Sequence, residues 1–488
     1  MPDKFYITTT TPYVNGEPHI GFAREIVVAD VIARWRALMG DEVKFNTGAD
    51  EHGQKVYEKA KELGKDPQTY TDELAPRFER LKSLLDLSFT NFTRTTDPHH
   101  KAAAQEFWRR CDKSGYIYKG KHKIKYCIGC ELEKTDSELE DDKCPIHPNK
   151  ELEIREEENY FFKFSAFAEP LLSLYAHNPN LVLPDFRFNE IKKFVGSGLQ
   201  DFSISRLKEK MSWGVPVPGD DAHVMYVWFD ALVNYISTLG WPEREDFGGF
   251  WPGVQVYGKD NLRQQTAMWQ AMLMAAKLPN TKQFLTLGFI TGDGGIKMSK
   301  SLGNVVDPES LTTEYGTDPL RYFLLRELSL WEDSPFTPER FKEAYNANLA
   351  NGLGNLASRI MKMAETHLSG GVASLPQGQS SGPTADGSGG LAFDSEFTDL
   401  MSHYELSKAM DYIWKEIGRL DTLIQQSEPF KLVKADPAKG KELIAELVIN
   451  LHAICQMLAP FLPATAEAIK TAIKANKSFT TPLFPRKD

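Results

Sequence analysis

The stretch that decides the fold runs from Phe5 to Met39 and reads FYITTTTPYVNGEPHIGFAREIVVADVIARWRALM. It begins with a β-branched run, Phe5–Thr9, which predicts a strand. The next segment, Asn15–Pro18, has the composition of a turn. From His19 to Met39 apolar residues recur at helical spacing. The stretch therefore predicts a strand, a turn and a helix in direct succession.

The alternation of strand and helix continues after this stretch and returns later in the chain. Glu42–Asn46 reads as a second strand and Glu51–Leu63 as a helix, which completes a βαβ order. The alternation returns much later with a strand, a helix and a strand, at Val254–Tyr257, Asn261–Ala276 and Gln283–Ile290. The sequence therefore predicts an α/β fold, a Rossmann-like parallel sheet divided by an insertion.

The insertion covers residues 116–200, which hold a cysteine cluster and the aromatic run Asn159–Phe162. We predict that the Rossmann-like domain occupies 1–115 and 201–338, on either side of it. Residues 339–488 read as all-helical, with helices at Glu339–His367, Ser395–Ser427 and Lys439–Ala475. Between the first two lies 368–391, whose Gly, Ser and Pro content predicts a flexible loop.

The composition limits the class of protein. The chain carries a net charge of −10, which weakly opposes nucleic-acid binding but leaves room for a local basic face. No run of about 18 apolar residues occurs, so we expect no transmembrane helix and no membrane partner. The first residues, Met1–Tyr13, lack the pattern of a secretory signal. The five cysteines are an odd number with one tight cluster, which favours a metal site in a reducing, cytoplasmic compartment.

The clustered cysteines form two knuckles. Two residues lie between Cys127 and Cys130, and two lie between Cys144 and His147. Thirteen residues separate the first pair from the second. Paired knuckles of this kind supply the four ligands of tetrahedral Zn²⁺, and a closed four-ligand site is structural. We predict one structural zinc ion per chain; the alternative is incidental reduced cysteines. The isolated Cys111 and Cys455 lie in helical patterns and are predicted to be buried packing residues.

Two further segments suit phosphate. The first, Pro18–Phe22, opens the first helix, where free N–H groups and the positive end of the helix dipole favour a triphosphate. The second, Lys297–Ser301, follows a strand and a glycine-rich turn and precedes the helix-capping pair Asp307-Pro308. Its two lysines can neutralise charge on a leaving pyrophosphate. Taken alone, the first segment is also compatible with an ordinary capped helix that carries an incidental histidine, and the second with an ordinary charged loop.

Together these segments resemble the HIGH and KMSKS motifs of class I aminoacyl-tRNA synthetases. KMSKS is intact, whereas Phe22 stands where HIGH ends in histidine. The resemblance implies that catalysis depends on His19, Lys297 and Lys300, and that ATP is bound with Mg²⁺. The implied ATP-binding residues are His19, Gly21, Phe22, Gly258, Asp260, Lys297, Met298, Ser299, Lys300 and Ser301.

Among class I enzymes the chain is similar to the methionyl family, through Pro12–Gly16, Ala49–Gly53, Trp213–Pro218, Tyr226–Ala231 and Gly258–Asp260. The resemblance implies activation of L-methionine and its transfer to tRNA(Met). Methionine's polarizable thioether suits an aromatic, mostly apolar pocket, and its ammonium needs an anionic partner, for which Asp50 is the candidate. The implied methionine-binding residues are Tyr13, Asp50, Trp228, Ala231, Leu232, Tyr235, Asn261, Gln265 and Trp269. Asn261 and Gln265 depart from the residues that many members have.

The helical region is expected to read the anticodon of tRNA(Met). Asn355 and Arg359 lie four residues apart, on one helix face, and match anticodon contacts of the family. Pro429-Phe430 falls where the family usually has Pro-Trp, so Phe430 can stack on a base without an indole donor. Because the chain reaches Asp488 without an appended dimerising domain, we expect a monomer.

Two alternatives stay open at this point. Another class I synthetase is one, although the long editing insertion of the branched-chain enzymes is not apparent. A zinc-containing tRNA-binding protein without catalytic activity is the other, supported only by Phe22 and Gln265.

Overall fold

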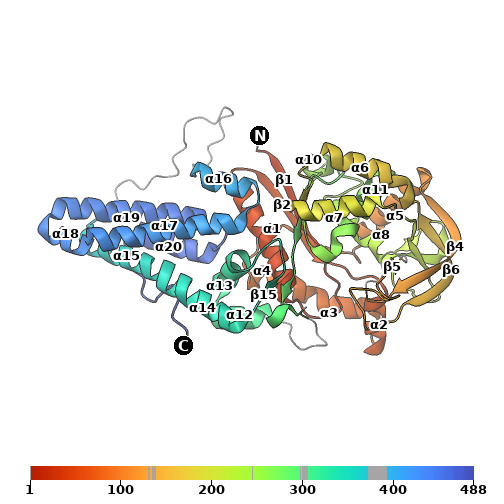
Figure 1. Ribbon diagram of the computed structural model, residues 1–488, viewed down its shortest axis with the longest axis horizontal. Helices are drawn as coiled ribbons and strands as arrows, with labels where there is room; N and C mark the ends of the chain where they lie inside the picture. Colours follow the sequence, from red (N-terminus) through yellow and green to blue (C-terminus); the bar gives the residue numbers. More distant parts are fainter. Residues whose placement is uncertain are drawn as a thin grey trace.

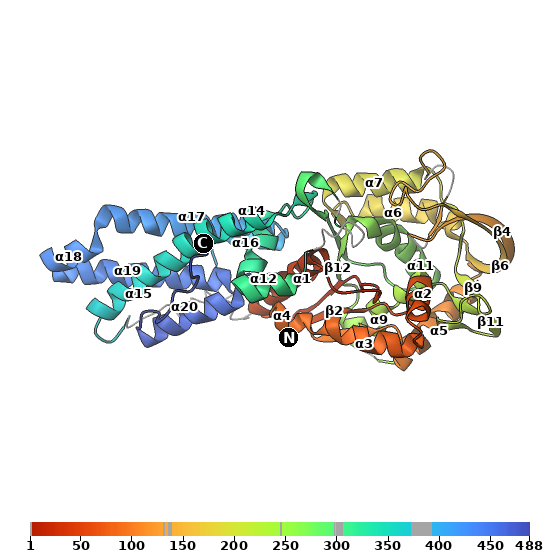
Figure 2. The same cartoon turned by 90° about the horizontal axis from the view of Figure 1, so that it is seen from below.

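The computed structural model describes residues 2–129, 132–134, 139–244, 246–296, 298, 306–371 and 393–488. The molecule is elongated, with a bundle of helices at one end and an antiparallel sheet at the other (Figure 1). The parallel sheet lies between these ends, and the view from below shows the same arrangement (Figure 2). Among the described residues, no helix is both long and apolar enough to cross a bilayer.

The central sheet has the strand order β3-β2-β1-β12-β13-β7, and each neighbouring pair is parallel. Its strands are β1 (Lys4–Thr9), β2 (Glu42–Ala49), β3 (Asn91–Arg94), β7 (Val182–Leu183), β12 (Val254–Gly258) and β13 (Gln283–Leu287). The strand order reverses direction between β1 and β12, and ligands of open parallel sheets bind at the carboxyl ends of strands at such a point. The predicted α/β fold with a divided, Rossmann-like sheet is confirmed.

Helices cover both faces of this sheet. The first is α1 (Ile20–Leu38), which packs on β1, β2 and β12 and shares one hydrophobic core with the helical end of the molecule. A second core lies on the other face, beneath α5 (Pro98–Lys113) and α11 (Trp269–Ala275). The remaining helices of this part are α2 (Gln54–Glu62), α3 (Pro67–Glu79), α4 (Leu81–Leu84), α6 (Ala168–His177), α7 (Asp185–Gly196), α8 (Val227–Ala231), α9 (Asn234–Ser237) and α10 (Asp246–Phe250), with the short helices η2 (Phe164–Phe167), η3 (Lys259–Asn261) and the π-helix η4 (Gln264–Met268).

The insertion is built on an antiparallel sheet of order β5-β4-β6-β8. Its strands are β4 (Ile117–Cys127), β5 (Leu132–Lys134), β6 (Glu153–Phe162) and β8 (Phe202–Ser203). A second small sheet, β10-β11-β9, contains β9 (Ser205–Leu207), β10 (Pro216–Val217) and β11 (Asp220–Met225). The aromatic run predicted in the insertion forms the end of β6, where Phe161 and Phe162 are buried.

The chain then passes from the sheet to the helical end. The strand β14 (Ile290–Thr291) pairs in parallel with β15 (Ser334–Pro335), and η5 (Asp293–Gly295) follows β14. The helix α12 (Pro308–Tyr315) begins at Asp307, whose carboxylate accepts a hydrogen bond from the Glu309 N–H, as the capping pair predicts. The helices α13 (Thr317–Tyr322) and η7 (Phe323–Glu327) complete this segment.

The helical end contains α14 (Pro338–Ala344), η8 (Tyr345–Gly354), α15 (Asn355–His367), α16 (Ser395–Ser402), α17 (Leu406–Ser427), α18 (Pro429–Ala435), α19 (Pro437–Leu458) and α20 (Pro463–Ala475). Two predicted helices were wrong in their extent. Ser395–Ser427 is broken where Tyr404 adopts a left-handed φ of 60°, which an α-helix cannot contain. Lys439–Ala475 is broken before Pro463, which lacks the N–H that a continuing helix needs.

Some predictions are not settled by these elements. Of the predicted loop 368–391, residues 372–391 lie outside the described residues. The domain boundaries at 115, 200 and 338 stay predictions. The isolated Cys111 and Cys455 are buried among apolar side chains, as predicted.

Candidate active site

A cavity of about 650 Å³ opens at the carboxyl ends of β1, β2, β12 and β13. Its lining includes the segment between β1 and α1 and residues around η4 and α8. Gly129, Ile146 and His147 of the insertion also line it. The cavity therefore collects side chains from segments that are far apart in the sequence but meet where the strand order reverses.

His19 caps the start of α1. Its Nδ1 accepts hydrogen bonds from the backbone N–H groups of Gly21 and Phe22, at 3.1 and 3.4 Å. Because Nδ1 is the acceptor, the proton of a neutral ring lies on Nε2, which is then a donor. A side chain at Gly21 would stand 3.0 Å from the imidazole, so glycine allows this close cap. The structure thus makes His19 both the cap of the helix and an imidazole donor at the cavity.

Phe22 stands where HIGH motifs have their second histidine, and its phenyl ring cannot make the hydrogen bonds of an imidazole. Its ring is buried and packs edge-on against Phe78 of α3, with the ring centroids 6.2 Å apart. Both residues line the cavity. Phe22 therefore contributes apolar wall and anchors α3, and it offers no hydrogen bond.

The KMSKS segment lies partly outside the described residues. Met298 is described, is half-buried and lines the cavity. Lys297, Ser299, Lys300 and Ser301 are not described. The chain resumes at Val306, whose carbonyl accepts a hydrogen bond from the Ile20 N–H at 3.2 Å. This bond joins the chain just before α12 to the start of α1, next to His19.

Most of the predicted methionine-binding residues line the cavity. Tyr13 and Trp228 meet edge-on with centroids 6.5 Å apart, and Lys55 lies over the Tyr13 ring. Asp50 is buried and is held by a short parallel bridge, in which the Val14 N–H bonds to its carbonyl and its own N–H bonds to Pro12. The lining residues from this predicted set are Tyr13, Asp50, Trp228, Ala231, Leu232, Tyr235, Asn261 and Gln265.

Trp269 is the exception within that set. It is fully buried, packs behind Tyr235 with centroids 6.0 Å apart, and stacks on Phe107. The described lining of the cavity does not include it. In this structure Trp269 supports the wall from behind, and its contact with a bound side chain stays a prediction.

A buried carboxylate with two imidazoles stabilises the same wall. Asp230 of α8 lies 2.6 Å from His52 Nδ1 and 2.8 Å from His100 Nε2. Burial alone would raise the pKa of Asp230, but the two imidazoles outweigh burial and lower it to about 2. His100 also bonds to Ser237. This network, which ties α5 and the segment after Asp50 to α8, was not found from sequence because its members are distant along the chain.

Two further carboxyl groups, those of Asp260 and Glu25, line the cavity. Asp260 follows β12, and its carboxylate lies close to Gly258, 2.9 Å from where a Cβ at that position would stand. Glu25 of α1 accepts hydrogen bonds from the Thr10 N–H and hydroxyl, at 2.8 and 2.5 Å. Burial raises the pKa of Glu25 to about 8, opposed by the Thr10 bonds and assisted by Asp260. Glu25 was missed from sequence, since nothing in a helical pattern marks one glutamate as buried.

The predicted metal ligands converge beside the cavity. The ligand atoms of Cys127, Cys144 and His147 lie within 4.8 Å of one another, so this group could hold a metal ion. Cys130, the fourth predicted ligand, lies outside the described residues. Gly129 is required here because a side chain would overlap the His147 ring. Sequence did not predict that this group borders the cavity that holds His19 and Asp50.

The predicted anticodon residues are distributed over two helices of the bundle. Asn355 is exposed at the start of α15, and Arg359 forms an ion pair with Asp421 of α17, with an N–O distance of 2.6 Å. Pro429 is buried at the start of α18, whereas the Phe430 ring is 47% exposed. The arrangement leaves an aromatic face and an amide accessible, and a tRNA contact at these residues stays a prediction.

Comparison with known proteins agrees with this arrangement. The family described as tRNA synthetases class I (M) matches residues 5–148 and 129–361. A methionine–tRNA ligase of Nostoc sp. is 38% identical over 94% of this chain and 88% of its own length. Those of Thermosynechococcus vestitus and Thermotoga maritima are each 39% identical, over 96% of this chain and over 90% and 74% of their lengths.

Solved structures agree as well. The Mycobacterium tuberculosis methionyl-tRNA synthetase in complex with methionyl-adenylate has a TM-score of 0.87 and 31% identity, over 99% of this chain and 100% of that chain. The free form of the same protein has a TM-score of 0.82 and 28% identity, over 100% and 99%. The strand order, the cavity and these similarities together show that the chain belongs to the methionyl-tRNA synthetase family of class I tRNA synthetases.

Proposed function

We propose that the protein is a methionine–tRNA ligase, which activates L-methionine with ATP and transfers it to the terminal ribose of tRNA(Met). The observation that supports this most directly is that one cavity receives His19, Asp50, Asp260 and an aromatic wall. A donor for phosphate, a carboxylate for an ammonium and an acidic group for ribose hydroxyls are the groups that methionyl-adenylate requires.

In the first step the methionine carboxylate attacks the α-phosphorus of ATP, the bond from that phosphorus to the bridging oxygen breaks, and pyrophosphate leaves. Asp50 would hold the ammonium, so that the carboxylate points toward the start of α1. His19, through Nε2–H, would donate to the phosphates, and Lys297 and Lys300 would neutralise charge on the pyrophosphate. Mg²⁺ bound with ATP would supply further positive charge to the phosphate oxygens.

In the second step the terminal ribose hydroxyl of the tRNA attacks the adenylate carbonyl and AMP leaves. In both steps the protein positions the substrates and stabilises the developing charge. We propose no general base among its residues. We propose that Gly258 and Asp260 contact the adenosine ribose, and that Glu25, which stands near Asp260, contributes to the same end of the site.

We propose that Cys127, Cys130, Cys144 and His147 hold one structural Zn²⁺. The donor set supports this, since two or more thiolates with an imidazole suit tetrahedral zinc. A metal there would fix the loop that carries Ile146 and His147 against the cavity. Metal analysis of the purified protein tests the proposal.

We propose that Asn355, Arg359, Pro429 and Phe430 read the anticodon, by hydrogen bonds to base edges and by stacking. We also propose a monomer that acts in the cytoplasm; light scattering of the purified chain and cell fractionation test these two points.

The function is tested by amino-acid-dependent exchange of pyrophosphate into ATP, with each of the twenty amino acids. Exchange that is driven best by methionine is expected. Exchange driven best by another amino acid would point to a different class I synthetase, and tRNA binding without any exchange would point to a non-catalytic tRNA-binding protein. In the same assay Lys300→Ala should lower the rate sharply with little change in the KM for methionine.

A further inference from the structure

One cation in the wall of the active-site cavity has no carboxylate partner. Arg24 of α1 lines the cavity and is 2% exposed. Within the described part of the chain, its guanidinium donates hydrogen bonds to two backbone carbonyls, those of Ser329, at 3.0 Å, and Gly288, and its Nε has no partner. A buried charge is costly unless an opposite charge balances it. The wall therefore holds a positive charge that the carbonyls satisfy only in part.

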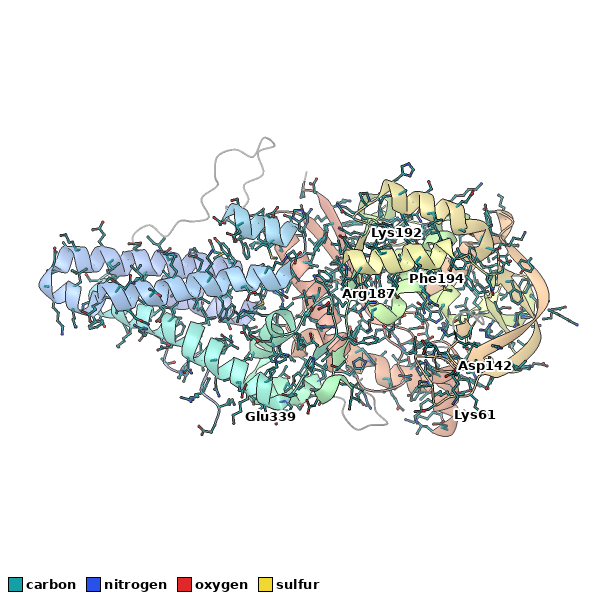
Figure 3. The ribbon with its side chains drawn as sticks, in the orientation of Figure 1. Lys61, Asp142, Arg187, Lys192, Phe194 and Glu339 are labelled. Atoms are coloured by element: carbon teal, nitrogen blue, oxygen red, sulfur yellow. The ribbon has the colours of Figure 1, made fainter. Side chains whose placement is uncertain are left out.

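Two carboxyl groups lie near enough to affect Arg24, and neither neutralises it. Burial lowers the pKa of Arg24 to about 10, opposed by Asp333 and Glu25, so the guanidinium stays charged at neutral pH. Burial raises the pKa of Glu25 to about 8, so this carboxyl group is mostly protonated at neutral pH. Asp333 forms an ion pair with Lys259 at 2.7 Å and also feels the charge of Arg187 on α7, which Figure 3 labels. The charge of Asp333 is thus shared among several cations.

Arg24 also stands close to the start of α1, where a helix favours anions. It lies three residues after Gly21, so the two residues occupy the same face of the helix, and both line the cavity. The N-terminus of α1, which His19 caps, adds the positive end of the helix dipole. The Gly288 carbonyl, which holds the guanidinium, lies between β13 and β14, ahead of the KMSKS segment. The helix terminus and Arg24 together make this part of the cavity positive.

We propose that Arg24 is a positioning residue for ATP, whose buried charge draws the triphosphate toward the start of α1. This inference rests on the proposed function and adds to it a cation outside the HIGH and KMSKS motifs. A polyphosphate supplies the negative charge that the wall lacks, and the field of a buried charge is screened less than that of a surface one. Because carbonyls hold the guanidinium and its Nε is covered, Arg24 acts through its field and not by contact. It thereby offsets the contribution that the Phe22 ring cannot make.

The test uses ligands that share a nucleoside and differ in charge. The dissociation constants of adenosine, AMP and ATP are measured by titration calorimetry, without methionine, for the wild type and for Arg24→Met. Loss of the buried charge should weaken the binding of ATP about tenfold and that of AMP about threefold, and leave adenosine within about twofold of the wild type. A distorted wall would instead weaken all three alike, so the ATP-to-adenosine ratio of affinities is the readout.

Two further variants separate charge from packing. Arg24→Lys keeps a positive charge but cannot reproduce the paired bonds to Gly288 and Ser329, and it should retain most of the ratio. Arg34→Met removes an arginine from the same helix, about 15 Å farther along its axis, where the side chain is 24% exposed. This control should leave the ratio unchanged.

The proposal is overturned if the ratio in Arg24→Met stays within twofold of the wild type, or if Arg24→Lys loses as much as Arg24→Met. If Arg24→Met does not fold, Arg24→Gln, which keeps an N–H donor for one of the two carbonyls, replaces it under the same criteria. Failure of the proposed function is a different result, namely a protein whose ATP binding depends on Arg24 but which shows no methionine-dependent exchange of pyrophosphate.

Discussion

The guanidinium of Arg321 on α13 lies 2.8 Å from the carboxylate of Asp30 on α1, and both side chains are completely buried. The remaining donors of Arg321 bond to backbone carbonyls on two sides of the molecule, those of Leu85, Pro460 and Phe461. One residue thereby ties α1, the helix that His19 caps, to the turn between α19 and α20 (Figure 1). Arg321 thus joins α1 to the helical end, through its ion pair with Asp30 on one side and its bonds to the Pro460 and Phe461 carbonyls on the other.

Arg321→Met should destabilise the protein strongly. The substitution leaves the Asp30 carboxylate without its buried partner and leaves several carbonyls without donors, and breaking a buried pair typically costs about 3–5 kcal/mol. The free energy of unfolding in urea measures the loss. Arg34→Met is the matched control, because Arg34 also contacts Asp30 at 2.8 Å but is 24% exposed, so its loss should be about 1 kcal/mol or less. Equal losses in the two variants would contradict the assigned role.

Glu25 should make the stability of the protein fall as pH rises toward 8. Burial raises the pKa of Glu25 to about 8 in the folded protein, whereas an unfolded glutamate titrates near about 4.3. Below the lower value both states hold the proton, so the group has no effect. Between the two values the unfolded state loses a proton that the folded state keeps, and stability falls by up to about 1.4 kcal/mol per pH unit.

Glu25→Gln should remove this contribution, because glutamine does not titrate and can still accept the Thr10 hydrogen bonds. The unfolding free energy, measured from pH 5 to pH 8, should decline less steeply in the variant than in the wild type. Glu17→Gln is the control, since Glu17 lines the same cavity but is exposed. A variant whose pH profile overlays that of the wild type would show that Glu25 is ionised in the folded state.

The sequence predicts those features that local pattern determines. A β-branched run, a turn and a helical period occupy adjacent residues, so β1 and α1 could be located within a residue or two. The cap at Asp307-Pro308 and the knuckle pair Cys144 and His147 are likewise short-range patterns. Each of these features forms within a few consecutive residues, so the local sequence is enough to predict it.

Features that depend on contacts between distant residues could not be predicted. The contact of Asp230 with His100 joins residues 130 positions apart, and the burial of Glu25 depends on β12 packing beside β1. The π-turn at Gln264 is stabilised by Gln270 and Tyr175, which no helical period reveals. The break at Tyr404 was missed because no glycine marks it: Tyr404 itself takes the left-handed φ, and the Glu405 N–H closes the end of α16 on the Leu400 carbonyl.

Cys144→Ser should remove bound metal and lower activity together. Serine is a poor ligand for a soft metal site, so the ion is expected to dissociate during purification. Because Ile146 and His147 line the cavity, the loop that the metal holds should become disordered beside the substrates and the exchange rate should fall. Metal content per chain and methionine-dependent exchange are the two measurements. Cys455→Ser, which changes a buried cysteine far from this group, should retain the metal.

Phe430→Ala should weaken charging of tRNA(Met) and leave the formation of adenylate unchanged. The ring is 47% exposed, so its removal costs little packing, whereas stacking on an unpaired base is worth about 1–3 kcal/mol per base. We therefore expect kcat/KM for tRNA to fall by about tenfold or more, with the exchange rate and the melting temperature close to those of the wild type. Asn355→Ala, at an exposed residue of α15, should act in the same direction.

Phe186→Ala is the matched control, because Phe186 is 45% exposed and lies on α7, away from the helical bundle. Removing an aromatic ring of equal exposure there should alter neither step. If Phe430→Ala and Phe186→Ala reduce charging to the same degree, the effect of Phe430 is not specific to its place on α18. If Phe430→Ala lowers exchange as much as charging, the ring acts through the active site and the proposed anticodon contact is wrong. If the bundle reads the anticodon, Phe430→Ala should lower charging without lowering exchange, and Phe186→Ala should lower neither.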